Sequence, residues 1–260
     1  MPSATELLAA YDAQLRVEAA SALSVARLGP LYLATYLGGR GWITYVDLAG
    51  ADGAAIRDLV VAALAHFERD PEITRVEWKT RGHDVAPGLH EALVDNGFVA
   101  GEPESIMIGE ARLLAVDAPL PEGVSLRRVT SEPDVRAMCA MESVAFDEDP
   151  SDEMAEQLLH RLSLDDGMEL WVAEADRRMV SAGRLEPVPD TEFAGIWGGA
   201  TLPEWRHRGI YRALTAARAR SALRLGKNYL QSDSTEYSRP ILERAGLVKV
   251  STTTPYEWRR

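Results

Sequence analysis

This sequence of 260 residues has a single cysteine, Cys139, and no apolar run close to the roughly 20 residues of a membrane-spanning helix. A lone cysteine excludes an intramolecular disulfide and suits a reducing compartment. The first residues also lack the basic start and long apolar core of a secretory signal peptide. We therefore expect a cytoplasmic protein without a membrane partner.

Lysine is nearly absent, with only Lys79, Lys227 and Lys249 in the chain. None stands in the Gly-x-x-x-x-Gly-Lys-Ser/Thr pattern of a P-loop, and no dinucleotide-binding Gly-x-Gly-x-x-Gly follows an early strand. The formal net charge of -12 repels a phosphate backbone, so nucleic acid is disfavoured as a partner. The acidity could attract a cationic amine, or it could simply keep the protein soluble.

The length of the chain allows one large core or two cores of ordinary size. The segment from Glu110 to Gly123 ends in DAPLPEG and breaks both helix and strand periodicity, which is typical of a linker. We predict one domain over residues 1–117 and a second over residues 118–260. In the first domain, composition and periodicity predict a helix over residues 4–23, strands over 31–37 and 42–48, and a helix over 52–68.

The most specific feature is a basic turn at residues 206–211, with the sequence RHRGIY. It follows an apolar run over residues 196–202, and apolar residues at helical spacing continue from Ile210 to Leu225. The first N–H groups of such a helix have no backbone partners, and Arg206, Arg208 and Arg212 are next to them in the sequence. This arrangement predicts a strand, a turn and a helix that together bind a diphosphate.

The turn resembles the acyl-coenzyme A binding motif of the GNAT superfamily of N-acetyltransferases, written Gln/Arg-x-x-Gly-x-Gly/Ala. The likeness covers the chain from about Val124 onward, through an expected strand at 228–232 and a helix that ends in Gly246-Leu247. It implies an α/β (α+β) fold with a mixed, mostly antiparallel central sheet flanked by helices. It also implies transfer of an acetyl group from acetyl-CoA to a primary amine by direct attack in a ternary complex, without a metal. Tyr211 departs from the motif, which usually has Gly or Ala there.

The resemblance also implies a set of acetyl-CoA contacts. They are Thr201, Leu202, Arg206, His207, Arg208, Gly209, Ile210, Tyr211, Arg212, Thr235 and Ser238. We expect His207 to contact phosphate or solvent rather than the amine. Leu242 stands where many family members have the tyrosine that protonates the departing thiolate. We nominate Tyr256 in its place, with Tyr237, Ser238 or a water as alternatives.

Acetyl transfer also needs a donor for the developing oxyanion and a general base. In the family, a backbone N–H of the strand before the phosphate turn meets the thioester carbonyl, where that strand separates from its neighbour. Gly198-Gly199 interrupts this strand, so we nominate the Gly199 amide; alternatively, the glycines only make room for Trp197 or another aromatic ring. We nominate Glu192, the nearest acidic residue on the N-terminal side, as general base, with an ordinary surface position as the alternative.

The first half repeats the order helix, glycine and strand at Gly97-Phe98, which suggests two similar GNAT-like domains in tandem. After its own strand at 42–48, however, it has GADGA at residues 50–54, which places an acidic residue where a phosphate would bind. We predict a degenerate first domain that does not hold the cofactor. An unrelated α/β domain is the alternative, because glycine commonly follows a helix.

Two other functions stay open. A CoA-binding regulatory or scaffold protein without turnover would explain Leu242 and the lack of a convincing base. A pure interaction module would use Trp197, Trp205 and Trp258, which look exposed in the sequence. For an acetyltransferase, aminoglycosides, polyamines, amino acids and protein N-termini all remain candidate acceptors, and a homodimer is an open option.

Overall fold

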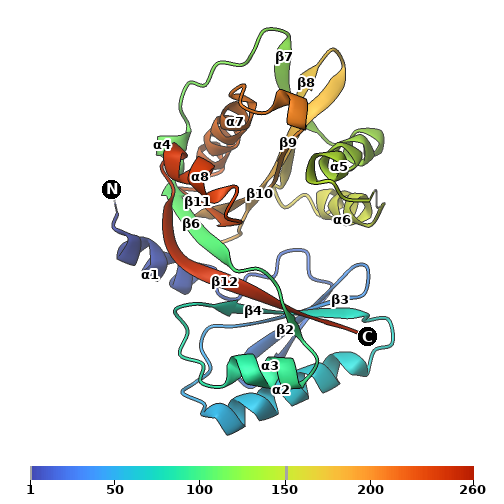
Figure 1. Cartoon of the computed structure of the whole chain (residues 1–260), viewed down its shortest axis with the longest axis vertical. Coiled ribbons are helices and arrows are strands. Elements are labelled where there is room, and N and C mark those ends of the chain that lie inside the picture. The colour runs from blue at the N-terminus through green and yellow to red at the C-terminus, as the bar shows by residue number, and fades with distance from the viewer. Residues whose placement is uncertain (1, 150–151) are drawn as a thin grey trace. The chain divides into compact units, whose positions relative to one another are not determined.

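The computed structural model describes residues 2–149 and 152–260, and the chain folds into two compact units. The N-terminal unit contains Pro2–Met107, Asp233–Pro240 and Lys249–Arg260. The C-terminal unit contains Ile108–Ser232 and Ile241–Val248. Within each unit, helices flank a mostly antiparallel sheet (Figure 1). This confirms the predicted α/β fold.

The N-terminal unit is built on one sheet. Its helices are α1 (Ala4–Gln14), α2 (Gly53–Glu68) and α3 (Leu89–Asp95). Its strands are β1 (Ser24–Leu28), β2 (Leu31–Tyr36), β3 (Arg40–Tyr45), β4 (Arg75–Arg81), β5 (Val99–Ala100) and β12 (Val248–Arg259). The order is β1-β2-β3-β4-β12, and only β3 and β4 are parallel.

Side chains alternate along these strands, so one face of the sheet is apolar. Ile43 of β3 and Trp78 of β4 are fully buried in a cluster with Ile56 and Val60 of α2. The helix predicted over residues 4–23 is shorter in the structure. It ends at Gln14, and residues 15–23 form turns and irregular chain that lead into β1.

From residue 152 onward the C-terminal unit has the same order of helices and strands as the N-terminal unit, and a strand at 124–129 and a helix at 132–146 precede it. Its helices are α4 (Ala111–Leu114), α5 (Glu132–Phe146), α6 (Asp152–Ser163), α7 (Ile210–Arg224) and α8 (Arg239–Ala245). Its strands are β7 (Val124–Val129), β8 (Glu169–Ala175), β9 (Arg178–Pro187), β10 (Phe193–Thr201) and β11 (Tyr229–Ser234), hydrogen-bonded in the order β7-β8-β9-β10-β11. Strand β6 (Glu104–Glu110) carries the chain from the first unit into the second.

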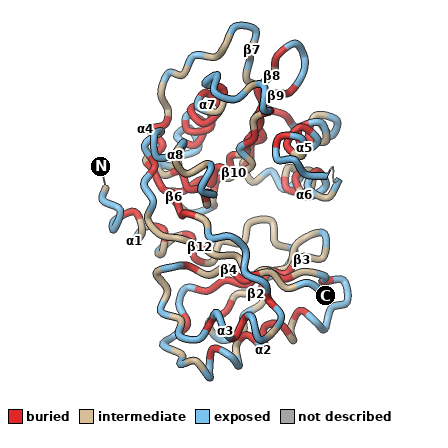
Figure 2. The backbone as a smooth tube through the Cα atoms, in the orientation of Figure 1, coloured by how far each residue is buried: buried red, intermediate tan, exposed pale blue. Residues whose placement is uncertain are grey.

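Helices cover both faces of the C-terminal sheet. Leu170 and Val172 of β8 pack with α5 and α6, whereas Ala173 and Ala175 of the same strand pack with Leu214 of α7. The alternation of side chains along a strand explains these two separate clusters. In Figure 2 the buried positions follow the central strands and the inner sides of α5 and α7. The sheet between them carries the site described below.

The two units are not separated by one boundary near Ala118, because each contains more than one segment of the chain. Strand β12, the last in the chain, pairs antiparallel with β4 from Thr253 opposite Arg81 to Arg259 opposite Arg75, and it also pairs with β5. The C-terminal residues therefore complete the sheet of the N-terminal unit. Strand pairing joins residues that are distant in the sequence, so local composition did not indicate this exchange.

Candidate functional site

The basic turn lies between β10 and α7. A short 3-10 helix, η1 (Pro203–Trp205), leads into it, and Gly209 adopts a φ of 82° directly before the first residue of α7. Glycine reaches this left-handed conformation without the steric cost that a side chain brings. His207 also has a positive φ, at 61°. The two left-handed residues turn the chain so that α7 starts immediately after the turn.

The N-terminus of α7 has no side-chain cap. Within residues 2–149 and 152–260, the N–H groups of Ile210, Tyr211 and Arg212 have no acceptor, and Ala213 is the first to donate back, to the Gly209 carbonyl at 3.0 Å. A Cβ on Gly209 would approach no atom closer than 3.8 Å. Open space beside unpaired N–H groups, at the positive end of a helix, suits a phosphate.

Two arginines of the turn already have contacts. Arg206 donates to the Thr201 carbonyl at 3.0 Å and to the Ala145 carbonyl at 2.8 Å, which ties the turn to β10 and α5. The guanidinium of Arg208 lies 4.8 Å from the centroid of the Trp205 ring. Arg206 therefore shapes the turn, while the exposed Arg208 remains available to an anion on its other side.

Strand β10 has a gap in its ladders between Trp197 and Ala200. It pairs with β11 only from Phe193 to Gly195, although β10 continues to Thr201. On its other side, the register with β9 is interrupted between Trp197 and Ala200 by a β-bulge. Gly198, with a φ of 59°, and Gly199 thus have no partner residue in the ladders with β9 and β11. A bulge of this kind disrupts the ladder and lets another group approach the backbone closely.

The ring of Tyr211 lies against this bulge. A Cβ on Gly199 would meet Tyr211 Cε2 at 2.6 Å and the Tyr211 hydroxyl oxygen at 3.1 Å. The glycine is thus needed for the close approach of an aromatic ring, and that ring is Tyr211. Trp197 instead packs on Gly195, where a Cβ would meet its Nε1 at 2.1 Å. The ring of Tyr211 therefore reaches the bulge while its backbone N–H stays at the start of α7.

Glu142 of α5 is an acidic side chain at the bulge that the sequence argument missed. It is 7% exposed, and its Oε1 atom has no hydrogen-bond partner among the described residues. A Cβ on Gly198 would lie 3.1 Å from that oxygen. Burial raises the pKa of Glu142 to about 7, against the opposing effect of Arg184 and Arg218.

A sequence signal for Glu142 existed. It stands four residues after Met138 and three before Ala145, both buried on the same side of α5. A carboxylate in an apolar helical stripe is unusual, because burying a charge is costly unless it is paired or protonated. This pattern in the sequence predicts a buried carboxyl group on α5.

The other nominated catalytic residues have hydrogen bonds within their own surroundings. Glu192 stands just before β10, where its carboxylate accepts a hydrogen bond from the Asn228 amide at 2.9 Å. About six residues of extended strand separate it from the bulge, or on the order of 20 Å. Tyr256 belongs to β12 in the core of the N-terminal unit, and its hydroxyl lies 2.8 Å from His90 Nδ1. Both side chains thus have hydrogen-bond partners of their own.

The remaining predicted cofactor residues occupy varied positions. The Thr201 hydroxyl lies 2.7 Å from that of Ser181, and the backbone N–H of Leu202 donates to a carbonyl of β9 at 3.0 Å. The exposed hydroxyls of Thr235 and Ser238 lie 3.3 Å apart, just before α8. Leu242, at the position of the family tyrosine, is 1% exposed and supplies no polar group.

The equivalent turn of the N-terminal unit is already occupied. Asp52 caps α2, and its Oδ1 accepts hydrogen bonds from the N–H groups of Ala54 at 3.1 Å and Ala55 at 2.9 Å. The carboxylate therefore lies where the helix would otherwise receive an anion. This agrees with the acidic residue that the sequence placed at this turn.

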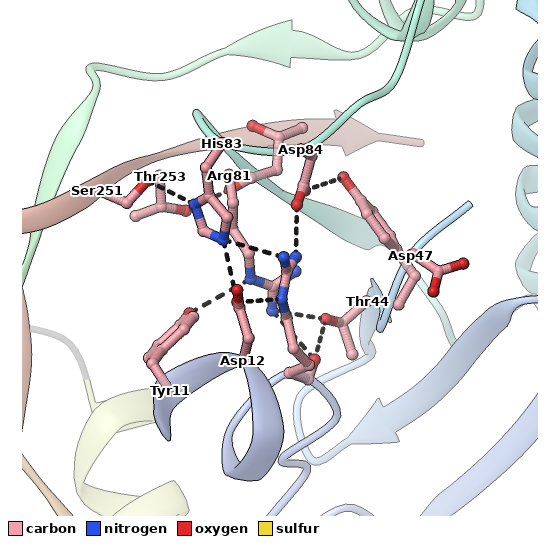
Figure 3. A network of polar contacts seen from close by, with 12 residues as sticks. Tyr11, Asp12, Thr44, Asp47, Arg81, His83, Asp84, Ser251 and Thr253 are labelled. Atoms are coloured by element: carbon pink, nitrogen blue, oxygen red, sulfur yellow. Dashed lines mark hydrogen bonds and ion pairs between the residues drawn. The ribbon is translucent and has the colours of Figure 1, made fainter. Parts of the chain in front are cut away.

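A polar network fills the region near the ends of β3 and β4 in the same unit (Figure 3). Arg16 donates to Asp12 and to Asp84, both at 2.6 Å, and the Tyr45 hydroxyl donates to Asp84 at 2.8 Å. Arg81 donates to the carbonyl of Arg16 at 3.0 Å. These contacts tie the segment after α1 to β3 and β4, so protein side chains occupy this end of the sheet.

No helix in the described residues is both long and apolar enough to cross a membrane. Within residues 2–149 and 152–260, no group of three or more histidine, cysteine, aspartate or glutamate side chains is arranged to hold a metal ion.

Comparison with known proteins agrees with this geometry. Residues 135–246 match the sequence profile described as the acetyltransferase (GNAT) family. The chain contains a GNAT acetyltransferase domain. The matched region includes Glu142, the bulge of β10 and the turn before α7. A GNAT domain supports acyl-transfer activity in general, and the family typically uses acetyl-CoA.

Solved structures with similar folds cover nearly the whole chain. A GCN5-related N-acetyltransferase from Kribbella flavida is 15% identical, with a TM-score of 0.65 over 98% of this chain and 93% of that chain. A tandem GNAT protein from the clavulanic acid biosynthesis pathway is 13% identical, with a TM-score of 0.62 over 92% and 85% of the two chains. At these identities the likeness shows a shared fold. A comparison with curated protein sequences found no match.

Proposed function

We propose that this protein is an acetyl-CoA-dependent N-acetyltransferase whose C-terminal unit binds the thioester and transfers its acetyl group to a primary amine. One observation carries the proposal: the uncapped start of α7 directly follows a strand that loses its ladder partners at Gly198 and Gly199. The first feature suits a pyrophosphate and the second suits a carbonyl oxygen. The GNAT domain supports both assignments.

The N–H groups of Ile210, Tyr211 and Arg212 would bind the pyrophosphate, with Arg208 and Arg212 adding positive charge. Backbone donors suit this task because they are fixed by the helix and need no reorganisation. Arg206 would keep the turn in place through its bonds to β10 and α5. Thr235 and Ser238 remain predicted cofactor contacts on the grounds of sequence.

The Gly199 amide would donate to the thioester carbonyl oxygen, where negative charge develops as the amine attacks. A donor fixed in place before the reaction stabilises that charge without reorganisation of its surroundings. The β-bulge supports this role because it leaves Gly199 outside the ladders on both sides. The acceptor is proposed to be a small-molecule or peptide amine, and the protein is proposed to act in the cytoplasm.

Isothermal titration calorimetry with acetyl-CoA tests the binding half of the proposal. We expect one site per chain and weaker binding at high salt, because the contacts to phosphate are partly electrostatic. Absence of binding at high micromolar acetyl-CoA would contradict the proposal. Release of the CoA thiol, measured with spermidine, glucosamine, kanamycin, amino acids and a short peptide as acceptors, then tests transfer.

The second candidate function is a CoA-binding protein without turnover. The observation in its favour is Leu242, which fills with a buried apolar side chain the position of the usual thiolate acid. Binding of acetyl-CoA without thiol release for any amine of the panel would favour this alternative.

A further inference from the structure

Glu142 is surrounded by ionisable groups from three elements. Cys139 lies on its own helix, Arg184 on β9, and Arg218 on α7, while β10 presents the backbone of Gly198. Burial, followed by the charge of Glu142, raises the pKa of Cys139 to about 11, so the thiol stays neutral. The two arginines are therefore the cations that act on this carboxyl group.

Both arginines have other partners. Arg184 lies 3.2 Å from Glu186 in an ion pair, and its Nη1 contacts the sulfur of Met154 on α6 at 3.5 Å. Arg218 is 1% exposed and donates to the carbonyl of Arg184 at 3.2 Å and to the hydroxyl of Thr215 at 3.2 Å. Neither arginine donates a hydrogen bond to Glu142 among those in the described residues.

A purely structural carboxylate would be expected to have donors. Leaving a buried polar atom unpaired costs about 1–3 kcal/mol, and more for a charged group. Glu142 Oε1 carries that cost and lies at the bulge, next to the residue whose amide is proposed to bind the thioester carbonyl. An acceptor without a donor at a reacting centre is what a general base requires before its substrate arrives.

We propose that Glu142 is the general base that takes the proton from the attacking amine. This inference rests on the proposed acetyltransferase function of the same site. The amine nitrogen forms a bond to the thioester carbonyl carbon, and the carbon–sulfur bond breaks. The proton leaves the nitrogen for Glu142 Oε1, and the departing CoA thiolate then takes a proton from Glu142 or from water. Amine and thioester thereby become amide and thiol, with no other reactant.

The test uses the full chain with Glu142→Gln, which keeps the shape of the side chain and removes its ability to accept the proton. Glu142→Asp keeps a carboxylate at shorter reach. Glu156→Gln makes the same chemical change at an exposed position on α6 and serves as the matched control. Acetyl-CoA binding by calorimetry and the melting temperature of each variant establish that it is folded and binds the thioester.

We expect Glu142→Gln to bind acetyl-CoA like the wild type and to lose kcat by about 100-fold or more with the best amine of the panel. The wild-type kcat should fall as the pH drops through about 7, where the raised pKa of Glu142 lies. This fall is the acid limb of the pH–rate profile, and Glu142→Gln should lack it. Glu142→Asp should keep the limb at a lower rate.

An unchanged kcat and pH profile in Glu142→Gln would overturn the role of Glu142 while leaving the acetyltransferase in place. A wild type that binds acetyl-CoA but acetylates no amine of the panel would overturn both. If Glu142→Gln did not fold, Glu142→Asp would decide: loss of its acid limb with intact acetyl-CoA binding would contradict the proposal.

Discussion

The two units share a strand–turn–helix–strand segment, but the N-terminus of its helix is capped in one unit and uncapped in the other. In each, a strand leads through a turn into a long helix and then to a parallel strand, as β3, α2 and β4 or as β10, α7 and β11. Asp52 caps α2 with its own carboxylate, whereas Gly209 leaves the first N–H groups of α7 without acceptors. The residue before each helix thus decides whether the first N–H groups are capped by a side chain.

The strand before each of these helices also differs between the units in the regularity of its pairing. β2 and β3 pair without interruption from Leu31 opposite Tyr45 to Tyr36 opposite Arg40, whereas β9 and β10 are interrupted by the bulge. Near the end of β3, the buried Arg16 forms ion pairs with Asp12 and Asp84. Regular pairing and paired charges both favour stability. At its proposed site the C-terminal unit instead has a bulged strand and a buried carboxylate oxygen without a hydrogen-bond partner among the described residues.

The largest effect is expected from the ion pairs of the N-terminal unit. Asp84→Asn should lower the free energy of unfolding by about 3 kcal/mol, because it removes a charge partner from the buried Arg16. Asp47→Asn, at an exposed position of the same region, should have little effect. Urea denaturation of both variants checks this. A loss of acetyl-CoA binding in Asp84→Asn, with the fold intact, would show that the network serves the cofactor after all.

Gly209→Glu should weaken acetyl-CoA binding by at least about 100-fold, because like charges placed together cost several kcal/mol. The matched change in the other unit is Gly53→Glu, at the start of α2, which should leave binding unchanged. Gly209→Ala separates the strain of the left-handed backbone from the added charge. Calorimetry on the three variants decides the point: loss of binding in Gly53→Glu instead would reverse the assignment of the two units.

Glu142 should make the C-terminal unit less stable as the pH rises. Its pKa in the folded protein is raised to about 7 from an ordinary 4.5, so the native state holds a proton that the unfolded chain releases earlier. The contribution of the protonated form is complete below pH 4.5 and is lost as the pH rises through 7, by up to about 3 kcal/mol. Glu142→Gln should gain stability relative to wild type over this window. Melting temperatures at pH 5 and pH 8 measure it, and an equal difference at both would contradict the unpaired state of Glu142.

The smallest effect is expected at the closed turn. Asp52→Ala should cost about 1 kcal/mol of stability, the usual value of a helix cap. Binding should remain at one acetyl-CoA per chain, since β3 has no bulge and the network occupies the end of the sheet. A stoichiometry of two in calorimetry would mean that the Asp52 carboxylate alone keeps the N-terminal unit from binding.

Much of the fold could be predicted because it depends on local patterns. The helical spacing after Ile210, the apolar strand before it and the glycine at 209 all lie close together in the sequence, and each forms the predicted element. The helix predicted through residue 23 ends at Gln14, and residues 15–23 instead form turns and irregular chain before β1. β12 joined the N-terminal unit through its pairing with β4, which local sequence patterns do not indicate.

The sequence by itself determined that a glycine-containing turn leads into the helix at residues 210–224, and that an acidic residue precedes the helix at residues 53–68. Both follow from one or two residues next to a helix start. Only the tertiary structure decided which carboxylate lies at the bulge and why Tyr211 is tolerated. Glu142 reaches Gly198 from another helix, and the ring of Tyr211 fits because residue 199 has no side chain. Such contacts depend on packing between elements that are far apart in the sequence, which a local pattern does not encode.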